Sequence, residues 1–442
     1  MKEFPLTYNF SSGLRSNEKN PVNSKGLTEC YNIILRQKLE GYQSITDPFG
    51  GAVDLDWPFP QLFLLNTGDF LLCERDGIYS VDDWSITKIA SPTGGGLWRL
   101  LDAYDYFIIL NGIDIYSGTC PCGDLVDVSS SIPNGVAACF HKGQIYVGNV
   151  TEGAFFVKVS DIGSATFTHN KMNVAASRPI PIRGNIYEMK PLGDHVVIYG
   201  SNGIVALTPV IGPAPAAASF RLTILTSFGI PCQGAVGGDE GIHLFVDSSG
   251  ILYMIDPSLS IKELGYQEYF SGMLGNNIIV NYDNQLKDFY IGDGTSQYIL
   301  TSGGLSEIGQ KISTCISYGG GPIGIYSNLA DQSAYLETDW IDMFNVANKY
   351  INSQEIGMMK KSTTKGYIST TVLRTSYGAG VTLPSFPINP KGNAAQKSNG
   401  NRFKFKLSFT SPEDLELSYM KIRWGLQEKN FIRGQYANEI NI

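Results

Sequence analysis

The stretch Asp194-His-Val-Val-Ile-Tyr-Gly-Ser-Asn-Gly-Ile-Val-Ala-Leu-Thr208 decides the fold class of this 442-residue chain. Two apolar arms flank a short turn that contains Asn-Gly, and such a turn supplies the positive φ that a tight hairpin needs. The arms are rich in β-branched and aromatic residues, which is typical of strands. The stretch therefore predicts a β-hairpin.

Similar hairpins recur along the chain. Their turns lie near residues 76, 112, 143, 203, 250, 284 and 321, and four of the six intervals span 31 to 37 residues. A period of about 40 residues with four strands per repeat is typical of a β-propeller, which leaves only short strand edges exposed. We interpret the two long intervals as extra strand material in residues 150–185 and a proline-rich insertion at residues 209–220. The spacing predicts six or seven blades.

The two ends of the chain differ from this array. Residues 1–60 are polar at first and predict an extended N-terminal arm, in which 29–36 alternates well enough to be a strand that closes the propeller or a sandwich. Residues 61–339 would form the propeller. Residues 340–442 contain the alternating stretch Arg402-Phe-Lys-Phe-Lys-Leu-Ser-Phe409 and predict a small C-terminal β-sandwich that serves for docking. The predicted fold class is therefore all-β.

The net charge of -8 hides an asymmetry along the chain. Residues 41–339 carry 13 Lys and Arg against 30 Asp and Glu, whereas residues 340–442 carry 14 against 7 and residues 1–40 carry 6 against 4. An acidic array with a basic end predicts two parts with different neighbours. Any single charge is equally well explained as ordinary solvated surface.

Composition also indicates the cellular compartment in which the protein folds. Seven scattered cysteines, at positions 30, 73, 120, 122, 139, 232 and 315, argue against a disulfide framework. The N-terminus lacks the apolar core of a secretory signal, and no apolar run approaches the ~20 residues that span a membrane. We expect a soluble protein that folds in a reducing cytoplasm, without stable membrane insertion.

No motif predicts a catalytic, cofactor-binding or metal site. The chain has four histidines, at positions 141, 169, 195 and 243. His141, His195 and His243 lie in or beside hairpin arms, where a structural hydrogen bond is the better interpretation. Cys120-Pro-Cys122 has the wrong spacing for a zinc knuckle. The glycine runs at 94–96 and 319–321 lack the Lys-Ser/Thr of a phosphate loop, and neither His-Glu-x-x-His nor Gly-x-Ser-x-Gly occurs.

Two other interpretations stay open. Some propellers are glycosidases built on two carboxylates, and this one has carboxylates beside Gly and Pro at Asp54, Asp56, Asp102, Asp105, Asp239 and Glu240. The Ser-x-Asp-x-Gly-x-Thr-Trp boxes of sialidases are absent. A carbohydrate-binding or glycoside-cleaving propeller is thus the alternative, and a host-side scaffold propeller is a third class.

Basic residues on two C-terminal strands raise the question of nucleic-acid binding. They are Arg402, Lys404, Lys406, Lys421 and Arg423. A half-exposed sheet places such charges outward in any case, where they protect strand edges. An acidic partner protein is the more economical functional use of that face.

Several short stretches resemble one family. Asn9-Phe-Ser-Ser-Gly-Leu14, Asn20-Pro-Val-Asn23, Glu29-Cys-Tyr-Asn32 and Leu39-Glu-Gly-Tyr42 resemble the start of the tail nozzle, or tail hub, proteins of short-tailed, podovirus-type bacteriophages. Val159-Ser-Asp-Ile-Gly-Ser-Ala-Thr-Phe167 is similar to a piece of their propellers. Glu337-Thr-Asp-Trp340 and residues 402–424 are similar to their closing portion. The resemblance spans most of the chain, which is shorter than several such proteins.

The resemblance implies a structural virion protein that is not an enzyme and needs no cofactor. Such a subunit forms a homo-oligomeric ring, a hexamer in the family, below the head-to-tail adaptor, and DNA leaves the capsid through it as passing cargo. Tail fibres or a needle would attach to it. The protein would be assembled in the host cytoplasm and reside in the virion tail. An acidic wall would repel DNA phosphates during passage.

Overall fold

The computed structural model describes residues 2–5, 13–15, 26–36, 38–119, 123–170, 172–182, 184–210, 219–327, 332–343, 347–361, 363–374 and 379–426. In these residues the secondary structure is β, apart from one helical turn, α1 (Gln267–Phe270), and the 3-10 turn η2 (Ser271–Met273). The chain forms two compact units. One contains residues 44–298 and 310–328, and the other contains residues 1–43, 299–309 and 329–442.

The first unit is a β-propeller whose first five blades are four-stranded sheets with the strands in chain order. Blade 1 contains β5 (Gln61–Leu64), β6 (Phe70–Cys73), β7 (Ile78–Asp82) and β8 (Ser85–Ala90). Blade 2 contains β9 (Arg99–Ala103), β10 (Tyr106–Leu110), β11 (Ile115–Gly118) and β12 (Val126–Asp127). Blade 3 contains β13 (Gly135–His141), β14 (Gln144–Val150), β15 (Gly153–Val159) and β16 (Ala176–Pro179). Blade 4 contains β17 (Ile186–Leu192), β18 (His195–Gly200), β19 (Gly203–Val210) and β20 (Ser219–Thr226). Blade 5 contains β21 (Val236–Asp239), β22 (Ile242–Val246), β23 (Leu252–Ile255) and β24 (Ile261–Gly265).

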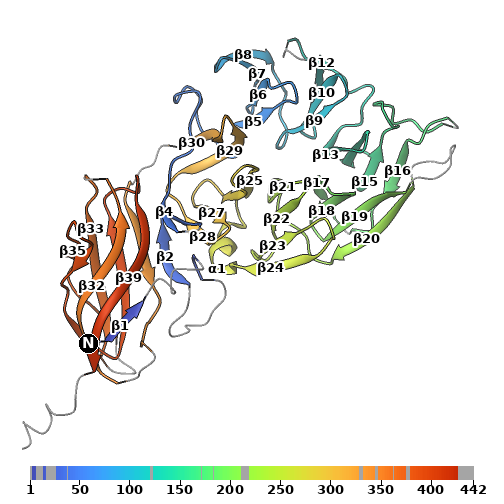
Figure 1. Ribbon diagram of the computed structural model, residues 1–442. Helices are drawn as coiled ribbons and strands as arrows, with labels where there is room; N and C mark the ends of the chain where they lie inside the picture. The colour runs from blue at the N-terminus through green and yellow to red at the C-terminus, as the bar shows by residue number, and fades with distance from the viewer. Residues whose placement is uncertain are drawn as a thin grey trace, which may run out of the picture. The chain divides into compact units, whose positions relative to one another are not determined.

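Two further blades complete the ring. The sixth begins with the hairpin of β25 (Ile279–Asp283) and β26 (Asp288–Gly292), and the next strand, β27 (Gln297–Thr301), straddles the boundary between the units. The seventh is the hairpin of β29 (Lys311–Tyr318) and β30 (Gly321–Ser327). The first strands β9, β13, β17, β21, β25, β29 and β5 contact one another in this order. Figure 1 shows them around the centre of the unit, with later strands further out. The all-β propeller is therefore confirmed, with seven blades.

The recurring turns mark one blade each, but not always the same hairpin of the blade. The turn at 203 joins the second and third strands of its blade, β18 and β19, whereas the turn at 143 joins the first and second, β13 and β14. Because the turn at 203 comes one strand later in its blade than the turn at 143, the interval between the two turns is longer than one blade. The strand Phe155–Val159 is part of β15, an ordinary third strand, and residues 165–168 are not a strand. Most of the insertion expected at 209–220 lies outside the described residues.

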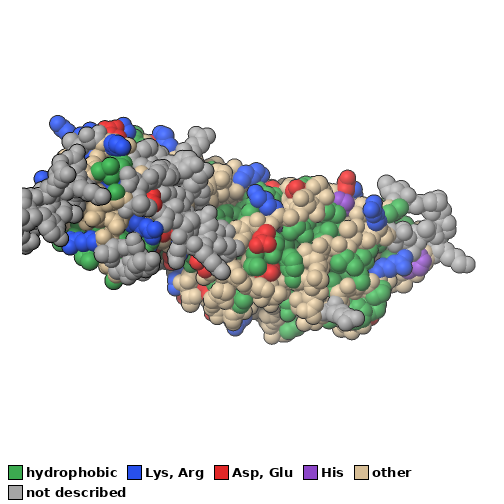
Figure 2. Space-filling view, turned by 90° about the horizontal axis from the view of Figure 1, so that it is seen from below, with side chains coloured by type: hydrophobic (Ala, Val, Ile, Leu, Met, Phe, Trp, Pro, Cys, Tyr) green, Lys and Arg blue, Asp and Glu red, His purple; other side chains and the backbone are tan. Residues whose placement is uncertain are grey.

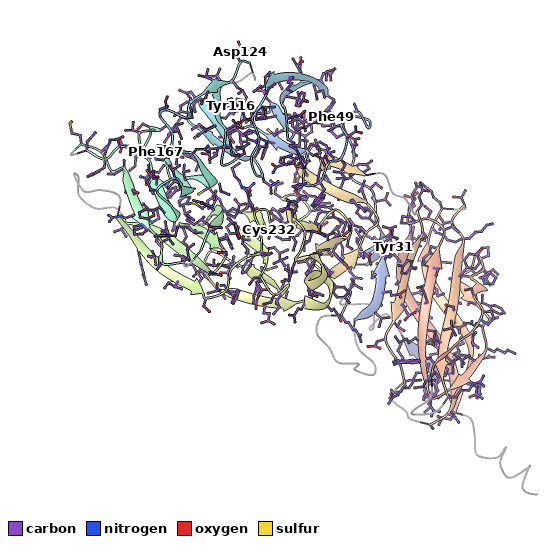
Figure 3. All side chains as sticks on the ribbon, turned by 180° about the vertical axis from the view of Figure 1, so that it is seen from behind. Tyr31, Phe49, Tyr116, Asp124, Phe167 and Cys232 are labelled. Atoms are coloured by element: carbon purple, nitrogen blue, oxygen red, sulfur yellow. The ribbon has the colours of Figure 1, made fainter. Side chains whose placement is uncertain are left out.

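The ring is closed by residues that precede β5 and not by 29–36. Thr46 forms a parallel bridge with Ile323 of β30, in which the Gly324 N–H donates to the Thr46 carbonyl at 3.0 Å. Phe49 (Figure 3) and Val53 then pack into the core between the seventh and first blades. The chain before the first blade thereby seals the seam where the ring begins and ends.

The second unit is a β-sandwich of two sheets. One sheet has the order β3 (Ile33–Leu35), β4 (Leu39–Gly41), β39 (Glu416–Leu426), β32 (Lys349–Met359), β36 (Asn393–Ala394), with β1 (Lys2–Pro5) on β39 and β37 (Ser398–Gly400) on β32. The other contains β28 (Gly304–Glu307), β2 (Leu27–Tyr31), β31 (Ala334–Thr338), β38 (Arg402–Phe409), β33 (Gly366–Leu373) and β34 (Val381–Thr382), with β35 (Phe386–Pro387) on β33. The aromatic residues of β38 are buried and alternate with its half-buried basic residues, as the sequence pattern predicts.

The units divide the chain differently from the ranges expected from sequence. The described N-terminal strands are not an extended arm, because β1 pairs with β39 and β2 pairs with β31. Strand β31 lies inside the range expected for the propeller, yet it pairs with β38 of the sandwich. The cause is long-range strand pairing. A short strand satisfies its backbone groups on whichever sheet edge is open, and its local sequence carries no mark of that edge.

Ring closure gives a first prediction. Phe49→Ala removes a buried ring that packs edge-to-face on Trp84 at 5.8 Å, and should destabilise the protein by about 3–5 kcal/mol in urea unfolding. Amide exchange of β30 should quicken at the same time. Phe155→Ala is the matched control, because Phe155 is 41% exposed and its loss should change stability by less than about 0.5 kcal/mol. Equal effects of the two substitutions would contradict this account of the seam.

Candidate functional site

The first strands of all seven blades line a cavity of about 640 Å³ at the centre of the propeller. Each of these strands pairs on one side only within its own sheet, so the N–H and C=O groups of its other edge face the axis. The cavity wall also carries five charged side chains, which are Arg99, Asp102, Glu188, Lys190 and Asp239. A cavity of this volume matches the size of small-molecule sites.

An ion pair crosses part of this cavity. The Arg99 Nε donates to Glu188 Oε1 at 2.8 Å, and Arg99 Nη2 donates to Oε2 of the same carboxylate. Both side chains are largely buried, at 13% and 3% exposure. Arg99 is on β9 of blade 2 and Glu188 on β17 of blade 4, so the pair reaches past the first strand of blade 3, β13. This bidentate geometry is the strong form of an ion pair between arginine and a carboxylate.

A second polar contact lies between blades 4 and 5. His243 is fully buried, its Nε2 lies 2.9 Å from the Pro191 carbonyl, and its Nδ1 lies 2.9 Å from the Tyr199 hydroxyl. A carbonyl can only accept, so Nε2 carries the proton and Nδ1 accepts from Tyr199. Burial, with the nearby Lys190 charge, lowers the pKa of His243 to about 3. His243 is therefore neutral and holds the two blades together.

The remaining histidines do not gather with it. His195 Nδ1 bonds the Thr208 hydroxyl at 2.8 Å, across the β18–β19 hairpin. His141 is buried at the end of β13, and burial lowers its pKa, whereas His169 is exposed. In the described part of the chain no three His, Cys, Asp or Glu residues are close enough together to hold a metal ion. Cys120-Pro-Cys122 lies outside the described residues, and the five other cysteines are free thiols.

The carboxylates weighed as glycosidase candidates are only partly brought together. Asp102 and Asp239 line the cavity, and the other four are not part of its wall. Asp102 accepts the Asn66 N–H, and Asp239 accepts the N–H groups of Gly241 and Ile242 at 2.8 and 3.1 Å. These contacts fix the ends of strands, which is an ordinary task for an acid beside a turn.

The outlying acids and the glycine runs have local explanations. Asp56 Oδ2 lies 3.2 Å from Arg75 Nε on the surface. Gly94 and Gly95 have φ of +137° and +136° in the loop before β9, and the Gly94 carbonyl accepts from the Asn111 amide at 2.8 Å. Gly319 and Gly320 form the β29–β30 turn with positive φ. No helix follows either run, so neither forms a phosphate loop.

The basic strands of the sandwich already have partners within that unit. Lys404 Nζ lies 5.4 Å from the centre of the Trp340 ring and 3.5 Å from Glu337 Oε1. Lys406 Nζ lies 4.3 Å above Tyr335 and pairs with Glu29. Arg423 pairs with Glu355 at 3.2 Å, and Lys421 lies 5.1 Å from the Tyr419 ring. Because these basic side chains are already engaged with acidic and aromatic side chains of the same unit, the contacts favour an ordinary exposed sheet face over a nucleic-acid interface.

Sequence reasoning singled out Asp102 and Asp239 but missed the three other charges of the cavity wall, Arg99, Glu188 and Lys190. Glu188-Met-Lys190 places two charges two residues apart in the first strand of its blade, so both lie on one face of β17. An isolated charged pair within an otherwise apolar strand was the available signal. Its partner, Arg99, lies 89 residues away, and no local pattern connects the two.

Comparisons with known proteins find only distant structural likeness. No protein-family model and no curated protein matches the chain. BamB from Moraxella catarrhalis is 9% identical with a TM-score of 0.37, covering 63% of this chain and 79% of that one. The Neurospora crassa Pan2 WD40 domain is 12% identical with a TM-score of 0.37, covering 63% and 85%. The extracellular domain of the putative one-component system BT4673 from B. thetaiotaomicron is 11% identical with a TM-score of 0.44, covering 81% and 48%. The propeller assignment rests on the strand order of this chain.

A search of the described residues for membrane-spanning helices finds none with the required length and hydropathy.

The crossing ion pair gives a second prediction. Glu188→Gln leaves the Arg99 charge buried without its carboxylate and should destabilise the protein by about 3–5 kcal/mol in urea unfolding. Combining it with Arg99→Met should recover most of that loss, because the charge itself is then gone. Lys142→Ala tests an exposed pair with Asp194 and should cost less than about 1 kcal/mol. A double variant as unstable as the sum of its parts would refute the pairing.

Burial of neutral histidine gives a third prediction. The His243 pKa is about 3 in the folded chain and about 6.5 when unfolded. Between these values the unfolded state binds more protons, so stability is full above pH 6.5 and falls as the pH drops towards 3, by about 1.4 kcal/mol per pH unit. His141 acts in the same direction. Urea unfolding between pH 7.5 and 4 should show a shallower slope for His243→Gln, and an unchanged one for the exposed His169→Gln. A slope that His243→Gln leaves unaltered would show that the ring is not buried and neutral.

Proposed function

We propose that the protein is a structural virion protein, the tail nozzle subunit of a short-tailed bacteriophage. It forms a ring below the head-to-tail adaptor, and DNA leaves the capsid through that ring. The observation that carries the proposal is the division of charge between the two units, taken together with the resemblance of the N-terminal stretches to nozzle proteins. The propeller ranges contain 26 Asp and Glu against 13 Lys and Arg, and the sandwich ranges contain 15 against 20.

The acidic propeller suits a wall past which DNA must slide. Binding of proteins to DNA comes largely from Lys and Arg that replace phosphate counterions, and a net charge of the same sign as DNA removes that attraction. The basic unit suits attachment to acidic neighbours, since complementary charge steers association. On the face of the sandwich drawn in Figure 2, Lys and Arg side chains are spread over the surface. The adaptor, and tail fibres or a needle, are the proposed partners.

The propeller axis itself is not the proposed conduit. Its cavity has a volume of about 640 Å³ and is crossed by the pair of Arg99 and Glu188, so it has room for a small molecule and not for a duplex. The channel of the proposed ring therefore runs between subunits, and each propeller serves as a rigid block of its wall. This role needs no catalytic residue.

A carbohydrate-binding propeller is the second candidate, and one observation favours it. Asp102 and Asp239 meet at the same cavity. A glycan array probed with the wild-type chain and with Asp102→Asn and Asp239→Asn variants tests it. Glycan binding that both variants abolish would promote this candidate above the nozzle.

Assembly tests the nozzle proposal. The full chain, alone and mixed with the portal and adaptor proteins of a short-tailed phage that encodes it, is analysed by size-exclusion chromatography with light scattering. The expected result is a ring-sized oligomer or a stable complex with the adaptor, without glycoside hydrolase activity. A chain that stays monomeric in the presence of all tail proteins would overturn the proposal.

A further inference from the structure

Lys190 is the unusual charge of the propeller. It lies on β17 in the wall of the central cavity, and its side chain is half-buried there. Its ammonium group makes no hydrogen bond or ion pair with the residues that the structure describes. Lysines withdrawn from solvent are normally paired, because an unpaired charge away from water is costly.

The carboxylates of the same wall are already engaged elsewhere. Glu188 accepts hydrogen bonds from both Nε and Nη2 of Arg99. Asp239 accepts two backbone N–H groups of its own turn and lies 3.5 Å from Lys287 Nζ. Asp102 accepts the Asn66 N–H. Lys190 is therefore the cation of the cavity wall that forms no ion pair with the described residues, although the wall carries three carboxylates and two cations in all.

The cavity offers space and hydrogen-bonding groups beside this cation. The neighbouring first strand, β21, contributes Gly237 and Gly238 to the wall, so no side chain projects from these positions. Gly237 is required there, since a Cβ would lie 2.5 Å from the Val280 carbonyl oxygen of β25. The inner edges of the first strands carry backbone N–H groups, of which some, such as those of Leu62 and Val280, already donate to neighbouring blades and the rest are donors for a ligand.

We propose that the central cavity binds a small anionic molecule, a carboxylate or a phosphate ester, whose anionic group pairs with the Lys190 ammonium. The volume of about 640 Å³ accommodates a small metabolite. Such a ligand gives the Lys190 ammonium an ion-pair partner and hydrogen-bonds to the strand edges. The inference concerns the propeller axis and stands independently of the role in a phage tail.

The electrostatics of the cavity agree with the binding of an anion. Burial lowers the pKa of Lys190, and the Arg99 charge lowers it further, while Glu188 acts in the opposite direction. A bound anion would reverse the balance and hold the ammonium protonated. Binding should therefore make the Lys190 amine less nucleophilic.

A binding experiment on the full chain tests the site with citrate and inorganic phosphate as probes. Calorimetry and thermal unfolding are compared with sodium chloride at equal ionic strength. The wild type should bind at least one probe and gain thermal stability, and Lys190→Met should bind at least tenfold more weakly. Without any probe, Lys190→Met should be as stable as the wild type or more so, because it removes an unpaired cation. Lys142→Met, at an exposed turn, is the matched control and should bind as the wild type does.

Chemical labelling of the wild-type chain gives a readout that does not depend on the variant folding. Acetylation of each lysine by acetic anhydride is followed by mass spectrometry with and without the probe. The probe should slow acetylation of Lys190 about tenfold and leave Lys142 unchanged. Equal labelling of Lys190 with and without both probes, or equal binding by wild type and Lys190→Met, would overturn the proposal.

Discussion

The propeller depends on one constraint, which is that every blade must bury both faces of its sheet against its neighbours. The described cores lie between blades and not within one. Blades 3 and 4 share Tyr146 and Ile198, and blades 1 and 2 share Leu71 and Phe107. Burial of such apolar surface is the main driving force of folding, at roughly 25 cal/mol per Å². An open ring would leave two sheet faces in water, so the seam formed by Thr46 and Phe49 supports all seven blades.

Closing the ring also creates the polar centre. The first strands converge on the axis with one edge unpaired, and charged side chains collect where apolar packing ends. Arg99 and Glu188 pair across that space, and the neutral His243 joins blades 4 and 5 through hydrogen bonds. The structure therefore has apolar seams between blades and a small charged interior, in which Lys190 forms no ion pair with any described residue.

The local parts of this fold could be predicted from the sequence. The hairpin of residues 194–208 was predictable because its Asn-Gly turn and β-branched arms act within 15 residues, and the alternation of Phe403 and Lys404 predicted which side chains of β38 are buried. Pairing between distant segments was not predictable. Nothing in residues 2–5 indicates a partner at 421–424, and the arm expected there is a strand of the sandwich. The contact between Arg99 and Glu188 depends in the same way on how three blades meet.

In the function that we propose, this acidic propeller is a building block of a ring through which DNA passes. The most direct test is a cryo-electron microscopy map of the assembled tail. The account predicts six copies of the chain below the adaptor, with acidic propeller surfaces turned towards an axial channel that runs between subunits. A map in which the chain is absent from the tail, or in which it surrounds no channel, would contradict the account.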